Sequence, residues 1–96
     1  MGAETFINVS KGKNAQDAFR LAVEQAAYDH GHGGYTGSLA EKDSFTMIPL
    51  PKGKNPEDYA NELINQQDDR IDDKWGPAGC FALPDGSFMF FGWASS

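Results

Sequence analysis

Residues 80–94, CFALPDGSFMFFGWA, predict a β-hairpin that organises the rest of the fold. The triplet Pro-Asp-Gly at 84–86 is typical of a tight turn between two antiparallel strands. Side chains of the second strand alternate between the two faces of a sheet, and both sets are apolar: Phe88 and Phe90 on one face, Met89, Phe91 and Trp93 on the other. Both faces of this strand must therefore be covered.

Four further elements are predicted before the hairpin. Residues 4–10 and 43–49 are short β-rich runs that end at turn-forming residues. A helix is predicted over 15–30, because Asn14 can cap it and apolar residues recur along it at intervals of three and four. A second helix begins at Pro56, directly after its capping residue Asn55. The order of elements is therefore βαβαββ.

This order predicts an α+β fold in a single domain, 1–96. If each crossover is right-handed and joins neighbouring parallel strands, both helices lie on one face of a four-stranded mixed sheet, in a two-layer sandwich. The apolar C-terminal strand would then be uncovered on the other face. We expect a homo-oligomer in which a partner subunit covers that strand; the alternative is cover by loops and the C-terminal tail of the same chain.

Charge and composition limit the possible partners. The net charge of -6 opposes direct binding to nucleic acid, and the basic residues are grouped only as KGK at 11–13 and 52–54. There is no apolar run long enough for a membrane span and no signal-peptide pattern, so we expect a cytoplasmic protein that does not bind membranes. The single cysteine, Cys80, is expected to be a small buried hydrophobe in a strand.

The stretch YDHGHGGYTGSLAEKD, residues 28–43, holds the candidate site. Ser38 and Glu41 have the spacing of a capping box, which predicts a short helical turn directly after the glycines. Free backbone amides of that turn and of the glycine-rich loop would suit phosphate or another anion. We therefore expect a small anionic or nucleotide-like ligand to bind through the loop 31–37.

Aromatic residues near this loop are candidates for ligand recognition. Tyr35 and Thr36 stand between glycines, where a ring can stack on a ligand while backbone amides approach it closely. Trp75, in DKWGPAG, is a candidate wall of the same site, and the competing interpretation is that it covers the core beneath a tight turn. The expected ligand-binding residues are the loop, its flanks and this tryptophan: His30, His32, Gly33, Gly34, Tyr35, Thr36, Gly37, Ser38 and Trp75.

Three other interpretations of the stretch stay open. In a small enzyme, His32 or Glu41 would be the acid or base, although no Ser-His-Asp or Cys-His spacing supports catalysis. His30, His32 and Asp29 are potential metal ligands, but an HxH pair cannot complete a tetrahedral site, and we expect no metal or cofactor. The glycines would also suit a compact connection with unusual backbone angles.

The segments HGHGGYTGSLAEKDSF, DKWGPAGCFAL and FFGWAS resemble small uncharacterised proteins of phages and their bacterial hosts, over most of residues 28–94. The resemblance implies that the chain binds, inhibits or sequesters a host factor, and it assigns no catalytic role to any position. The leading hypothesis is a non-enzymatic binding protein for a small ligand. The alternative is an acidic inhibitor of a host defence protein, acting through carboxylates of the run DDRIDD: Asp68, Asp69, Asp72 and Asp73.

Overall fold

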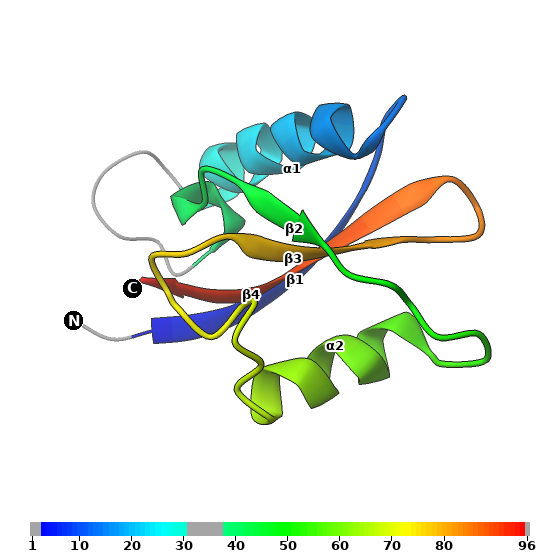
Figure 1. Ribbon diagram of the computed structural model, residues 1–96. Helices are drawn as coiled ribbons and strands as arrows, with labels where there is room; N and C mark the ends of the chain where they lie inside the picture. Colours follow the sequence, from blue (N-terminus) through cyan, green and yellow to red (C-terminus); the bar gives the residue numbers. More distant parts are fainter. Residues whose placement is uncertain (1–2, 31–37, 96) are drawn as a thin grey trace.

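The computed structural model describes residues 3–30 and 38–95, which form helices, strands and one short 3₁₀ helix (Figure 1). In chain order the elements are β1 (Ala3–Lys11), α1 (Ala15–His30), the 3₁₀ helix η1 (Leu39–Glu41), β2 (Phe45–Met47), α2 (Pro56–Asn65), β3 (Ala78–Ala82) and β4 (Ser87–Ser95). The predicted α+β class and the βαβαββ order are confirmed.

Both helices begin at the residues that the sequence indicates. Asn14 Oδ1 accepts a hydrogen bond from the Asp17 amide at 2.8 Å, at the start of α1. Asn55 Oδ1 accepts one from the Asp58 amide at 3.1 Å, and Pro56 occupies the first turn of α2. Each cap satisfies an amide that has no partner within the helix, which fixes where the helix starts.

The four strands form one mixed sheet in the order β1-β4-β3-β2. Strand β4 pairs antiparallel with both β1 and β3, whereas β2 pairs parallel with β3. Strands β1, β3 and β2 therefore all run in the same direction. The predicted hairpin joins β3 to β4 and is closed by the Leu83 amide, which donates to the Ser87 carbonyl at 2.9 Å.

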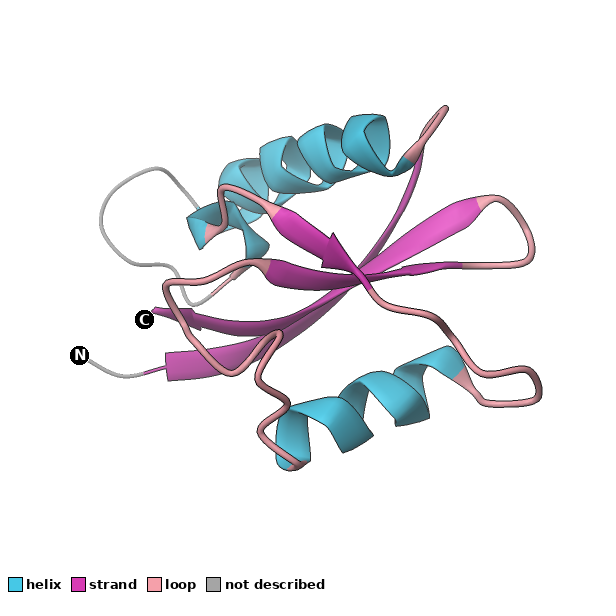
Figure 2. Ribbon diagram, in the orientation of Figure 1, coloured by secondary structure: helices cyan, strands magenta, loops and turns pink. Residues whose placement is uncertain are grey.

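The two helices lie on opposite faces of this sheet, so the prediction of a two-layer sandwich with both helices on one face is wrong (Figure 2). Helix α1 packs on the face that carries Phe6, Cys80 and Phe90. Helix α2 packs on the face that carries Phe81 and Phe91. The protein thus has three layers, with the sheet between the helices.

Strand order explains this difference. The crossover from β1 to β2 spans the whole width of the sheet in one direction, and the crossover from β2 to β3 returns in the opposite direction. Right-handed crossovers that advance in opposite directions place their helices on opposite faces. The prediction assumed that both crossovers joined neighbouring strands and advanced the same way.

Helix α2 also covers the strand face for which a partner subunit was expected. Met89 and Phe91 of β4 are buried in the same cluster as Leu63 and Ile64 of α2. Strand β4 is an inner strand with a hydrogen-bonded neighbour on each side. The prediction that a homo-oligomer forms through the apolar C-terminal strand therefore loses its basis, because the chain itself covers that strand.

Aromatic packing fills the core on both faces. On the α2 side, the Phe81 and Phe91 rings lie 4.5 Å apart between centroids. Gly79 lies against Phe91, and a Cβ atom at this position would come within 2.5 Å of a Phe91 ring carbon. On the α1 side, Cys80 is fully buried, as expected for a small hydrophobe.

Candidate functional site

Most of the predicted loop site lies outside the described residues. This applies to all of 31–37, and hence to the predicted ligand-binding residues His32, Gly33, Gly34, Tyr35, Thr36 and Gly37. His30 is the last residue of α1 and Glu41 the last residue of η1, but their side chains also lie outside the description. The ligand-binding and catalytic roles of these residues remain predictions.

Ser38 follows the loop and caps the predicted short helical turn, which is confirmed as η1. Its side-chain oxygen accepts a hydrogen bond from the Ala40 amide at 3.3 Å, and the residue is buried. Burial and capping give Ser38 a structural role at the start of η1, in addition to its predicted place beside the ligand.

A buried lysine, Lys42, connects the segment 38–42 to the turn 73–76, which contains Trp75. Lys42, directly after η1, is only 3% exposed. Its Nζ donates hydrogen bonds to the backbone carbonyls of Asp73 at 3.3 Å, Lys74 at 3.0 Å and Gly76 at 2.9 Å. Burial lowers the pKa of Lys42, and the nearby Asp73 carboxylate acts in the opposite direction. Lys42 thus holds the flank of the predicted loop beside the turn 73–76.

Trp75 is 61% exposed, so the interpretation that it covers the core is wrong. Its amide donates to Asp73 Oδ1 at 2.9 Å, and Lys74 Nζ lies 5.5 Å from the centre of its ring. Ser38 and Trp75 both precede strands, at the amino ends of β2 and β3. The structure therefore brings together the segments that flank the predicted site, although the loop itself is not described.

The acidic run is only partly available for a partner. Asp68 is held by Arg70, whose Nε and Nη2 donate to its two carboxylate oxygens at 2.9 Å each. Asp69 and Asp72 are exposed. Among the described residues, no group of three His, Cys, Asp or Glu side chains converges on a point where a metal ion could bind.

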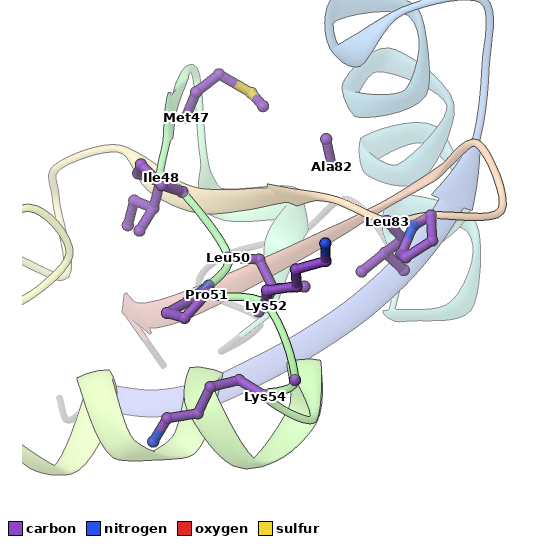
Figure 3. A pocket seen from close by; sticks show the side chains of 11 residues that line it. Met47, Ile48, Leu50, Pro51, Lys52, Lys54, Ala82 and Leu83 are labelled. Carbon is purple, nitrogen blue, oxygen red and sulfur yellow. The ribbon is translucent and has the colours of Figure 1, made fainter.

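A separate pocket lies at the opposite end of the sheet, beyond the carboxyl ends of β2 and β3 (Figure 3). It has a volume of about 530 Å³. The wall consists of the end of β2, the connection to α2 and the start of the β3–β4 turn: Met47, Ile48, Pro49, Leu50, Pro51, Lys52, Gly53, Lys54, Ala82, Leu83 and Pro84. This wall is mainly apolar, and its charged groups are two lysines.

The two lysines differ in orientation and in partners. Lys54 Nζ bonds to Glu62 Oε2 at 3.1 Å and lies 5.5 Å from the centre of the Tyr59 ring, on α2. Lys52 instead points across the pocket toward Ala82 (Figure 3). None of the ion pairs among the described residues includes Lys52. Lys52 is therefore the cation that the pocket offers to a ligand.

The pocket was not predicted from the sequence, in which KGK at 52–54 is only a local group of charges. A signal was present, because PLPKGKN connects a predicted strand to a capped helix, and ligands of α/β proteins often bind at such connections.

Comparison of the chain with protein-family models, with curated proteins and with solved structures gave no match. Within the described part of the chain, neither helix is long and apolar enough to cross a membrane.

Proposed function

We propose that the protein binds a small anionic molecule with an apolar body, in the pocket between residues 47–54 and 82–84. The observation that carries this proposal is Lys52, a lysine directed across an apolar pocket and without an ion-pair partner in the described structure. A phosphate or carboxylate head group would pair with Lys52. An aromatic or aliphatic body would contact the apolar side chains of Leu50 and Leu83.

The position of the pocket in the fold supports ligand binding. Ligands of open α/β sheets commonly bind beyond the carboxyl ends of parallel strands, where the connecting loops leave the sheet. Here β2 and β3 are parallel, and their carboxyl ends both reach the pocket. A volume of about 530 Å³ lies within the range typical of small-molecule sites.

The glycine-rich loop 31–37 is a second candidate place for the same class of ligand. Its predicted contribution is backbone amides and the Tyr35 ring, not a lysine. Inhibition of a host defence protein through the acidic run Asp68, Asp69, Asp72 and Asp73, and acid–base catalysis by His32 or Glu41, remain alternative proposals. The experiments below separate the pocket from the loop.

Thermal unfolding with a panel of anions tests the proposal. The panel contains inorganic phosphate, naphthyl phosphate and straight-chain carboxylates of increasing length. A ligand selective for the folded state raises the unfolding temperature by mass action. We expect stabilisation by naphthyl phosphate and the longer carboxylates, and a much smaller effect of inorganic phosphate, because apolar burial supplies most of the affinity.

Lys52→Ala and Lys54→Ala form a matched pair of variants for titration with the best ligand. Lys52→Ala should weaken binding by about fivefold, the value of a partly exposed ion pair of about 1 kcal/mol. Lys54→Ala should leave the dissociation constant nearly unchanged, because Lys54 is already paired with Glu62. Equal losses in both variants would contradict the assigned role of Lys52.

Amide chemical shifts locate the ligand. Binding at the pocket predicts changes at residues 47–54 and 82–84. Changes confined to residues 31–38 and Trp75, together with an unaffected Lys52→Ala variant, would move the site to the glycine-rich loop. No stabilisation by any member of the panel would refute the anion-binding proposal.

A further inference from the structure

Strand β1 is a long edge strand that neither a proline nor a β-bulge protects, and its charged residues lie only near its two ends. It pairs with β4 through nine consecutive residues, Ala3–Lys11, and no strand of the described chain pairs with its other side. It contains no proline, and its register is uninterrupted by a bulge. The opposite edge strand, β2, has only three residues and is followed by Pro49 and Pro51. Unprotected edges of this length readily pair with another strand.

Exposed apolar side chains lie beside this edge on both faces of the sheet. Five large hydrophobic residues are exposed in the described chain, and three of them lie here: Val9, at 57%, on the α2-facing side of β1, and Leu21, at 40%, and Tyr28, at 83%, on α1. Leu21 and Tyr28 of α1, together with residues 8–11 of β1, line a groove of about 510 Å³ along the edge. Side chains of an added strand that point toward α1 would enter this groove.

We propose that a second copy of the chain occupies this edge, with the two β1 strands antiparallel about a two-fold axis at Ile7. Residues i and 14 − i would then face each other, which pairs Ile7 with its own copy and Thr5 with Val9. These three side chains lie on the α2-facing side of the sheet. Ile7 packs against the buried cluster of α2, and side chains two positions apart on a strand point to the same face. All three are β-branched, a favourable combination for cross-strand pairs.

The charges of β1 also suit a second copy. The described strand has one acidic residue, Glu4, near its start and one basic residue, Lys11, at its end. Antiparallel pairing brings the acidic end of each strand to the basic end of the other, whereas parallel pairing would place like charges together. Strand β1 carries one negative and one positive charge, although the whole chain has a net charge of -6. This edge therefore offers little electrostatic attraction to a basic peptide.

The resulting dimer would be closed. Its eight-stranded sheet would end on both sides at β2, which is short and followed by prolines. Such an isologous contact uses the same surface on both copies and leaves no long free edge for further growth.

Sedimentation of the 96-residue chain over a range of micromolar concentrations tests the proposal. We expect a species of twice the chain mass of 10.5 kDa at the higher concentrations. Val9→Lys should raise the dimer dissociation constant by about tenfold or more, because lysine on an edge opposes strand pairing. Met47→Lys is the matched control, since Met47 is 48% exposed on the other edge strand, and it should leave dimerisation unchanged.

A monomer at all concentrations would overturn the proposal. So would an oligomer that resists Val9→Lys or that is lost equally in Met47→Lys. Circular dichroism and the unfolding temperature establish that each variant is folded, because both substituted side chains are exposed. A monomer that binds an extended peptide at β1 would assign the edge to a different partner and would likewise overturn self-pairing.

Cysteine cross-linking tests the register. In the proposed dimer the two Cα atoms of Ile7 would be about 4.5–5.5 Å apart, within the range that a disulfide bridges. Ile7→Cys should therefore form a covalent dimer under mild oxidation, and Cys80 does not interfere because it is fully buried. Thr5→Cys should not, because the two introduced thiols would be separated by about 13 Å along the strands. Cross-linking of Thr5→Cys but not of Ile7→Cys would refute the register.

Discussion

Replacement of Lys42 by methionine should destabilise the fold strongly, although Lys42 lines neither the proposed binding pocket nor the groove beside β1. Methionine keeps a flexible apolar stem of similar length and removes the ammonium group. The substitution therefore eliminates the three hydrogen bonds from Nζ to the carbonyls of residues 73, 74 and 76.

The magnitude follows from these three bonds. The Asp73 carbonyl keeps a partner, because the Gly76 amide also donates to it at 2.9 Å. The carbonyls of Lys74 and Gly76 lose the two shorter bonds, each worth about 1.5–3 kcal/mol for a charged donor. Relief of the burial cost of the ammonium offsets part of this loss. We expect a decrease of about 2–3 kcal/mol in the free energy of unfolding, or about 10–20 °C in the unfolding temperature.

Chemical denaturation of the wild type, Lys42→Met and Lys54→Met provides the measurement. Lys54 ends in an ion pair at the surface, where the side chains of Lys54 and Glu62 are 48% and 41% exposed. Its replacement should therefore change the free energy of unfolding by less than about 1 kcal/mol. If Lys42→Met proves as stable as the wild type or more so, the burial cost outweighs the three bonds, and Lys42 does not hold the two segments together.

Three further predictions concern other parts of the core and surface. Gly79→Ala should lower the free energy of unfolding by about 1–3 kcal/mol or more, because the added Cβ meets the Phe91 ring; denaturation at wild-type stability would contradict this packing. Hydrogen bonds from Arg70 lower the pKa of Asp68 from its ordinary value of 3.8 to about 2. This contribution to stability is therefore complete above pH 3.8 and is lost as the pH falls through about 2; NMR titration should show a midpoint near 2, and its return toward 3.8 in Arg70→Ala. Burial raises the pKa of the Cys80 thiol to about 12, so a thiol reagent should label it at mildly alkaline pH only as fast as the protein opens; rapid labelling of the folded protein would refute this.

Local features of the fold could be predicted from sequence because their causes are local. Asn14 and Asn55 accept amide hydrogen bonds from residues only three positions ahead, so the sequence pattern alone indicates where each helix starts. The turn 84–86 and the alternation of β4 are similarly short-range. The faces of β4 were therefore assigned correctly, with Phe90 on one side and Phe91 on the other.

The face occupied by α2 could not be predicted in this way. It depends on β1 lying at the far edge of the sheet, beside β4, and this pairing joins residues that are more than 70 positions apart at every point of its register. Neighbouring parallel strands were the simpler assumption. The apolar periodicity of a crossover helix is the same whichever face of the sheet the helix covers, so the sequence of α2 does not indicate its face.

The roles of the lysines at the candidate sites could not be predicted from local sequence either. Lys42 stands between Glu41 and Asp43, a context typical of an exposed charge, and its carbonyl partners are 31 to 34 residues away. Lys52 and Lys54 look equivalent in KGK, and only the position of Glu62 distinguishes them. Contacts with residues outside the immediate sequence neighbourhood decide that Lys42 is buried and that Lys54, not Lys52, is paired.

The inner position of β4 has a consequence for synthesis of the protein on the ribosome. Until residues 87–95 have left the exit tunnel, β1 has no neighbouring strand, and only the parallel pair of β2 and β3 can form. Phe6 and Ile7 then remain without the strand against which they are packed in the native sheet. Pairings of such large sequence separation form slowly and leave apolar segments exposed in the meantime. The sheet is therefore completed only after translation of its last strand, and release of a chain shortened by that strand would leave β1 free to aggregate.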